Sequence, residues 1–238
     1  MGAFIYGVIL QWKLDLRNKG ILVTYYLVPL LFFLFIGTIF TSINPLAKDT
    51  LIQSMTIFAI TMGAFLGTPI PLVELYSGDI KKAYKVGGIP IWVGVVNNYI
   101  SAFVHLMITS LIIFLVAPLV FDARLPDKPL PYFGYLSIFL ITCISIGVVL
   151  GLYIKSISKL TMFSQMLFLP SMMLSGIMFP TDMLPKVLEN VGFLLPATWG
   201  LRILTSSEPK ILWFLPLLLF FLVAIILGAC KLSRIAMD

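Results

Sequence analysis

The sequence predicts an all-α integral membrane protein, and three observations lead to that class. Apolar residues make up 60% of the chain and charged residues only 11%, and the mean hydropathy of +1.08 lies far above that of a soluble domain. Several apolar stretches reach the roughly 18 to 20 residues that a helix needs to cross the hydrocarbon core. They lack the alternation of a barrel strand, and a helix satisfies its own backbone hydrogen bonds in lipid, so we expect helical spans.

Six apolar stretches are candidates for these spans, and together they take up most of the 238 residues. They cover residues 21–43, 51–73, 91–118, 132–153, 160–178 and 211–230. Little sequence remains for a soluble catalytic domain. We therefore expect a single transmembrane domain over residues 1–238, with no catalytic residue.

The lysines and arginines predict the orientation of this domain. If the N-terminus is cytoplasmic, ten of the 16 Lys and Arg residues fall on the cytoplasmic side and six on the outer side. Acidic residues balance the outer six, so the formal net charge of +6 lies on the cytoplasmic side, as the positive-inside rule requires. Both termini are then cytoplasmic. The basic balance indicates membrane topology, and no nucleic-acid partner is expected.

Residues 1–20 are expected to form an interfacial helix and not a cleavable signal. Lys13, Asp15, Arg17 and Lys19 follow the apolar stretch, whereas a signal peptide carries its charges before it. One face of the expected helix carries Phe4, Ile5, Val8, Ile9, Trp12 and Leu16. Such an amphipathic helix lies in the headgroup plane. An early start of the first span is the alternative.

The loop of residues 74–90, between the second and third spans, is the most informative cytoplasmic segment. Glu74 to Tyr84 can form about three turns of helix, which Gly87 and Gly88 would end. This helix could dock on a soluble partner. The alternative is an ordinary solvated loop whose lysines set the topology.

The outer segment of residues 179–209 is too long to be a simple turn. Its apolar positions at helical spacing are Met183, Val187, Val191 and Leu194 or Leu195, which predicts a short amphipathic helix. We expect a re-entrant hairpin in which a second arm follows this helix and is anchored at the interface by a Trp ring. The residues that shape the hairpin are Pro180, Pro185, Pro196 and Trp199, and Pro196 is expected to break the helix.

His105, about midway along the third span, is the most unusual side chain within the membrane. As a proton relay it would need a carboxylate, and the spans offer none once their ends are trimmed. A structural or pore-lining role is favoured, with a hydrogen bond to Ser101 or Thr109, each four residues away. A single histidine cannot fill a coordination shell, so no metal site is expected.

Other polar side chains in the spans either join helices or face a cavity. The candidates for a substrate pathway are Asn97, Asn98, His105, Gln165, Ser171 and Ser175. Asn97 and Asn98 are adjacent and project about 100° apart, so at least one should face the protein interior. Two G-x-x-x-G pairs permit close helix contact within the subunit or at a dimer seam. They are Gly63 with Gly67 and Gly147 with Gly151.

Two short motifs carry a resemblance to a known family. The loop after the second span has the form E-x-x-x-G, a basic stretch and a proline, given by Glu74, Gly78, Lys81, Lys82 and Pro90. The later segment reads L-S-G-x-x-F-P over residues 174–180, followed by Leu184 and Pro185. With six spans and an N-terminal amphipathic helix, this order resembles the ABC-2 type transporter permease family.

The resemblance implies a dimer of permeases, identical or paralogous, driven by cytoplasmic ATPase subunits that bind ATP and Mg²⁺. This chain would bind no cofactor itself, which agrees with the lack of a G-x-x-x-x-G-K-[ST] motif. The resemblance also implies outward transport and contacts with the ATPase through the N-terminal helix and the loop. The residues expected to make those contacts are Trp12, Arg17, Glu74, Gly78, Asp79, Lys81 and Lys82.

An amphiphilic cargo is expected, such as a drug, an antimicrobial peptide or a lipid-linked molecule. The predicted cavity is apolar with scattered methionines, although methionine also serves as core filler. The main alternative is a secondary carrier or channel that needs no ATPase. A membrane-embedded enzyme would require a cluster of His, Asp, Glu or Cys near an interface. We expect a multi-pass protein of a prokaryotic cell membrane, in contact with lipid.

Overall fold

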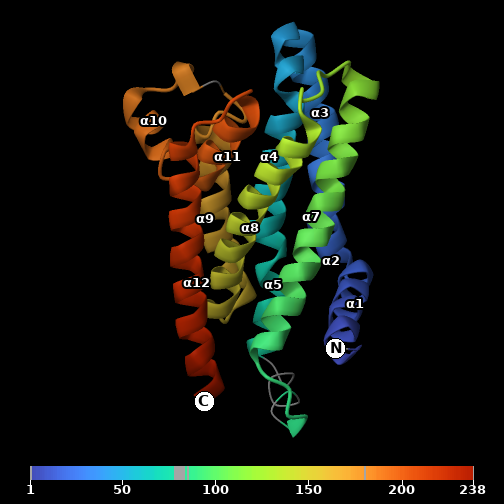
Figure 1. The fold of residues 1–238 in the computed structure, drawn as a ribbon, viewed down its shortest axis with the longest axis vertical. Coiled ribbons are helices and arrows are strands. Elements are labelled where there is room, and N and C mark those ends of the chain that lie inside the picture. The colour runs from blue at the N-terminus through green and yellow to red at the C-terminus, as the bar shows by residue number, and fades with distance from the viewer. Residues whose placement is uncertain (1, 78–83, 85, 180, 238) are drawn as a thin grey trace.

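A computed structural model describes residues 2–77, 84, 86–179 and 181–237. Within these residues all regular structure is helical and no strand occurs. Long helices run roughly parallel to the longest axis of the molecule (Figure 1). This arrangement confirms the predicted all-α class.

Five stretches of the described residues are long and apolar enough to cross a membrane. They are Lys19–Ile43, Leu51–Tyr76, Trp92–Phe121, Pro129–Tyr153 and Ile211–Ile235. Each coincides with a predicted span to within a few residues. The sixth predicted span, 160–178, corresponds to α9 (Ile157–Leu174), which is not one of the five. Its sequence contains Lys159, Gln165 and three serines, so its hydropathy is lower.

The first two of these stretches are each interrupted by a π-helical turn. The first consists of α2 (Lys19–Leu22), η1 (Val23–Leu27) and α3 (Val28–Ile43). The second consists of α4 (Leu51–Met62), η3 (Gly63–Gly67) and α5 (Pro69–Ser77). Every residue of α4 is buried, so the second stretch is the central helix of the bundle.

The other long helices surround this centre. They are α7 (Trp92–Phe121), α8 (Pro129–Tyr153), α9 and α12 (Phe214–Met237). The G-x-x-x-G pair of α8 packs within the subunit, because a Cβ on Gly147 would touch the backbone of Ala64 and one on Gly151 would lie 2.8 Å from the Pro69 carbonyl oxygen. Small residues therefore allow α8 to approach η3 and α5 closely.

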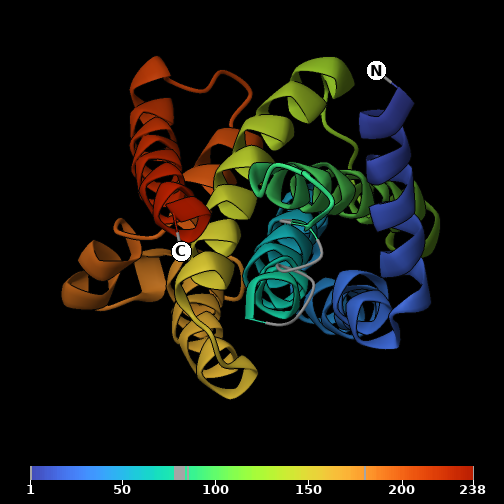
Figure 2. The same cartoon turned by 90° about the horizontal axis from the view of Figure 1, so that it is seen from below.

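The two ends of the bundle differ. One end, which we call the terminal end, carries both chain termini, the last turns of α5 and the first turns of α7 (Figure 1). There α1 (Gly2–Arg17) packs against α7. Viewed along the bundle, α1 is seen side-on while the long helices are seen closer to end-on (Figure 2). The N-terminal helix thus lies across the bundle.

The opposite end, which we call the hairpin end, carries the short helices. They are η2 (Pro45–Asp49), η4 (Thr181–Met183), α10 (Lys186–Gly192), α11 (Pro196–Thr205) and η5 (Ile211–Trp213). The first arm does not run on to Pro196 as expected, because α10 ends at Gly192. Pro196 is instead the first residue of α11, since the fixed φ of proline suits the first turn of a helix. Leu201 and Leu204 on α11 are buried. The second arm is therefore a core helix and packs on α4, α8 and α12.

Candidate functional site

A group of buried polar side chains lies where α1, the first two spans and α7 meet. We call this group the polar core. It consists of Asp15, Tyr25, Tyr26, Thr68, Asn97, Asn98, Ser101, His105 and Thr109, of which only Tyr26 is half-buried and the rest are buried. Polar groups in such an apolar bundle are costly unless they are hydrogen-bonded, so their partners decide what the polar core can do.

The two π-helical turns face each other in the polar core. Tyr25, in η1, fits against η3 because Gly63 and Gly67 have no side chains: a Cβ at these positions would lie 2.9 Å and 2.7 Å from the Tyr25 ring. The Tyr25 hydroxyl lies 3.2 Å from Thr68 Oγ1. π-Helical turns occur frequently at functional sites, and here they place a polar contact between the first two spans.

His105 contacts the first span and α1. Its Nδ1 lies 2.6 Å from the Tyr26 hydroxyl, and its ring stacks at 5.4 Å on Tyr25 and at 6.0 Å on Trp12. The predicted hydrogen bond to Ser101 or Thr109 is therefore wrong for the imidazole, because tertiary packing supplies Tyr26 from another helix. Thr109 Oγ1 instead donates to the carbonyl oxygens of Tyr25 (2.8 Å) and His105 (3.2 Å).

A carboxylate does reach the third span, although the spans themselves contain none. Ser101 Oγ donates to Asp15 Oδ2 at 2.6 Å, and Gln11 Nε2 donates to Asp15 Oδ1 at 2.9 Å. Sequence reasoning placed Asp15 among the cytoplasmic charges and missed this contact. The only sequence signal for this contact is spacing: Gln11 and Asp15 stand four residues apart on the expected helix, beside Trp12.

Asn97 and Asn98 are both buried. Asn98 Nδ2 donates to the Thr68 carbonyl oxygen at 3.0 Å, which links α7 to the second span. Asn97 points towards α1, where a Cβ on Gly7 would lie 2.8 Å from its Nδ2. The Oδ1 atoms of both amides, the Nε2 of His105 and the Nε1 of Trp12 have no partner among the described residues. The polar core thus retains unused hydrogen-bonding capacity.

The remaining pathway candidates lie apart from the polar core, on and just after α9. Gln165 is exposed, whereas Ser171 and Ser175 are buried. Ser171 Oγ donates to the Leu167 carbonyl oxygen of its own helix at 2.7 Å. The structure therefore brings Asn97, Asn98 and His105 together on α7 and leaves the α9 residues elsewhere.

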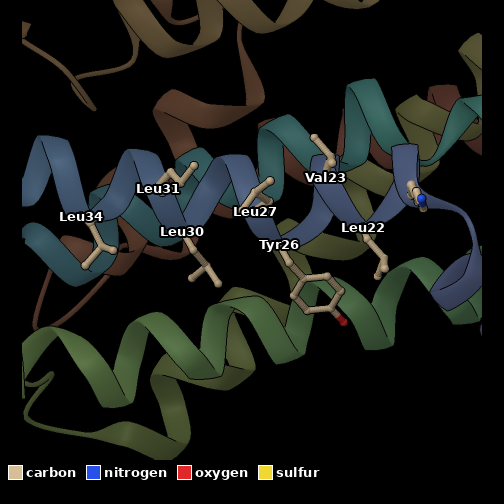
Figure 3. Close-up of a pocket in the computed structure, with 8 residues that line it drawn as sticks. Leu22, Val23, Tyr26, Leu27, Leu30, Leu31 and Leu34 are labelled. Carbon is tan, nitrogen blue, oxygen red and sulfur yellow. The ribbon is translucent and has the colours of Figure 1, made fainter.

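An apolar groove of about 600 Å³ runs along the outer face of the first span (Figure 3). Its lining residues are Lys19, Leu22, Val23, Tyr26, Leu27, Leu30, Leu31 and Leu34. Tyr26 lies between this groove and the polar core, since its hydroxyl reaches His105. The groove thus adjoins the polar core through a single side chain.

A second, polar pocket of about 650 Å³ opens at the hairpin end. Asp49, Gln53, Arg124 and Glu208 are among its lining residues. Arg124 forms an ion pair with Asp127 at 3.6 Å. This pocket combines both signs of charge, in contrast with the groove.

The hairpin residues have structural contacts. Pro185 immediately precedes α10, and Trp199 Nε1 donates to the Phe193 carbonyl oxygen at 2.8 Å. The guanidinium of Arg202 lies over the rings of Phe193 and Trp199, 4.4 Å and 5.6 Å from their centroids, in cation–π geometry. Pro180 lies outside the described residues.

The expected ATPase contacts divide into three groups. Glu74 and Arg17 are exposed at the terminal end, so their side chains are available to a partner. Trp12 instead stacks on His105 and points into the protein. The remaining four, Gly78, Asp79, Lys81 and Lys82, lie outside the described residues.

No described residues form a group of three or more His, Cys, Asp or Glu side chains that could hold a metal ion. The hydrogen bonds of the polar core join α1, the first two spans and α7.

The model of the ABC-2 type transporter family matches residues 4–208, which include α1, the polar core and both arms of the hairpin. No individually curated protein matches the sequence. The matched region covers well over half of the chain, and the chain therefore belongs to the ABC-2 type transporter family.

Proposed function

We propose that this chain is the permease subunit of an ATP-driven exporter that moves a small or amphiphilic molecule outward across the cell membrane. Members of this family are the membrane components of transporters and are not themselves catalytic. The match over residues 4–208 carries the proposal. The sequence has no phosphate-binding glycine loop, so ATP would be hydrolysed on a separate subunit.

We propose six crossings, with α9 as the fifth. Both chain termini lie at the terminal end (Figure 1), and a chain that starts and ends on one side of a membrane must cross it an even number of times. Five long apolar helices therefore need a sixth crossing. With 18 residues, α9 is about 27 Å long at 1.5 Å per residue, close to the hydrocarbon thickness of about 30 Å.

The terminal end is the proposed docking face for the ATPase. It carries exposed Glu74 and Arg17, whose opposite charges suit a polar, reversible contact. It also carries α1, which connects to spans one, two and three through the polar core. Movement at the docking face would thus be passed to the first two spans, where paired π-helical turns offer a place to bend.

The proposed route for cargo lies between two permease copies. Met162, Gln165 and Met166 are exposed on one stretch of α9, and a polar amide among flexible apolar side chains suits an amphiphilic molecule. The second copy is either the same chain or a paralogue. In this arrangement the hairpin end, with α10 and α11, faces outward near the exit.

Copurification tests the proposal directly. The tagged chain is isolated from its native membrane in mild detergent, co-purifying proteins are identified by mass spectrometry, and ATP hydrolysis is measured with and without vanadate. We expect a stoichiometric ATPase and vanadate-sensitive hydrolysis. A chain that purifies without an ATPase under conditions that keep it folded would overturn the proposal and favour the carrier or channel alternative.

Charge reversal at Glu74 tests the docking face. Glu74→Lys should lower ATP hydrolysis by the complex at least severalfold, because it places a positive charge opposite the cation that the ATPase would present to Glu74. The permease itself should keep its elution volume in detergent. The matched control is Glu189→Lys, a reversal at a partly exposed carboxylate on α10 at the hairpin end, which should leave hydrolysis unchanged. Equal activity of the two variants would exclude Glu74 from the contact.

A further inference from the structure

Asp15 is an ionisable side chain in a place that disfavours its charge. It retains only 2% of its exposure, although it belongs to a helix at the end of the bundle. Its two oxygen atoms accept hydrogen bonds from Ser101 and Gln11, both of them neutral. Within the described part of the chain, no Lys or Arg nitrogen forms an ion pair with it. A buried carboxylate without a cation is costly when ionised.

The groups that face Asp15 confirm the lack of positive charge. Helix α7 contains no Asp, Glu, Lys or Arg, and its titratable side chains are His105 and Tyr99. Tyr99 turns away and donates to the Ile141 carbonyl oxygen of α8. From the first span, Tyr25 and Tyr26 lie against His105. The three nearest cations in the sequence, Lys13, Arg17 and Lys19, are all exposed.

Burial raises the pKa of Asp15 above its ordinary value of 3.8, and the hydrogen bonds from Ser101 and Gln11 lower it in part. The neutral acid keeps oxygen lone pairs for both donors. It also avoids the cost of a buried charge. Asp15 can therefore keep both hydrogen bonds while it is protonated, and its ionisation makes the docked position of α1 less stable.

We propose that Asp15 and Ser101 form a protonation-controlled clasp that holds α1 against the third span when Asp15 is neutral and loosens it when Asp15 is ionised. The proposal requires neither an ATPase nor a cargo. It concerns the position of α1 in the permease chain itself.

The direction of the pH effect follows from proton linkage. The docked pKa is higher than that of a released, solvated Asp15, so the released state loses its proton first as the pH rises. The docked position of α1 is most stable at pH values below 3.8, the ordinary pKa of Asp15. Docking then weakens by about tenfold per pH unit until the raised docked pKa is passed. Above that point it stays constant at its weaker value.

Hydrogen exchange of the full-length chain in lipid nanodiscs measures docking. Backbone amides of residues 4–15 are followed from pH 4 to pH 8, and each rate is divided by the intrinsic exchange rate at that pH. The wild type should lose protection across the linkage window, by about tenfold per pH unit. Asp15→Asn keeps the shape and an acceptor oxygen but cannot ionise, so its protection should not vary with pH. Equal pH slopes in both proteins would overturn the proposal.

Cross-linking provides a second measurement that does not depend on a pH series. Gly7 and Asn97 are in contact across the α1–α7 interface, and exposed Cys230 is first replaced by alanine. In that background Gly7→Cys with Asn97→Cys should form a disulfide at pH 7 at least severalfold faster when Asp15→Asn is added. Glu189→Gln, at a partly exposed carboxylate of the hairpin end, serves as control and should not alter the rate. A disulfide rate unaffected by Asp15→Asn would also contradict the clasp.

Discussion

Gly147 on α8 is the position where one methyl group should disturb the bundle most clearly. A Cβ added there would touch the backbone carbonyl of Ala64 in η3, lie 3.1 Å from its carbonyl carbon, and lie 3.5 Å from Thr68 Cβ. The obstacle is backbone and not the end of a flexible side chain. Gly134, on the same helix, has nothing within 4 Å of such a Cβ and is exposed, which makes it a matched control.

The expected size of the effect comes from comparing two variants. Gly→Ala within a helix gains up to about 1 kcal/mol of helix propensity, and this gain is common to both positions. Overpacking a tight interior costs about 1 to 3 kcal/mol, and only Gly147→Ala incurs that cost. The difference between the variants therefore reports the close contact, at about 1 to 3 kcal/mol. For a chain of this size that corresponds to a difference in Tm of roughly 2 to 12 °C.

Thermal unfolding of both variants in the same detergent measures this difference. We expect Gly134→Ala to match or exceed the wild-type Tm and Gly147→Ala to fall below it. If the two variants unfolded at the same temperature, α8 would not lie closely against η3, and Gly147 would not be needed for close helix packing.

Two further predictions concern the polar core and the crossing by α9. Tyr26→Phe removes the hydroxyl bonded to His105 and should lower the free energy of unfolding by about 1 to 3 kcal/mol, because a buried nitrogen loses its partner. Tyr6→Phe, at an exposed tyrosine, should leave the Tm unchanged. Equal effects of the two changes would contradict the hydrogen bond. Ser156 and Met183 lie before and after α9 in the sequence. In a Cys230→Ala background, a membrane-impermeant maleimide added to intact cells should label Met183→Cys but not Ser156→Cys. Labelling of both would show that α9 does not cross the membrane.

The five long spans were predicted from the sequence because hydropathy is a sum over neighbouring residues. The energy of placing a 20-residue helix in lipid depends mainly on its own side chains. The boundaries of Lys19–Ile43 and Leu51–Tyr76 thus follow closely from their apolar runs. The predicted span 160–178 is less apolar, because Lys159 and Gln165 lower the hydropathy of α9, and its crossing stays a prediction.

The candidate site was predicted only in part. Asn97, Asn98 and His105 were recognised as polar residues in a span, and both amides prove to be buried. Their partners were not predicted: Tyr26 lies 79 residues from His105, and Asp15 lies 86 residues from Ser101. No local pattern encodes such pairs, since each depends on how helices pack. The π-helical turns of η1 and η3 were also missed, because their side-chain pattern does not differ from that of a continuous span.

The sequence by itself determined the class of this protein, an all-helical membrane protein. This property depends on local transfer energies, which add up along the chain. Only the tertiary structure decided that α1 docks through Asp15, that η1 and η3 meet at Tyr25, and that α11 is a buried helix. Each of these depends on contacts between distant segments, whose free energy exists only when the helices are packed together.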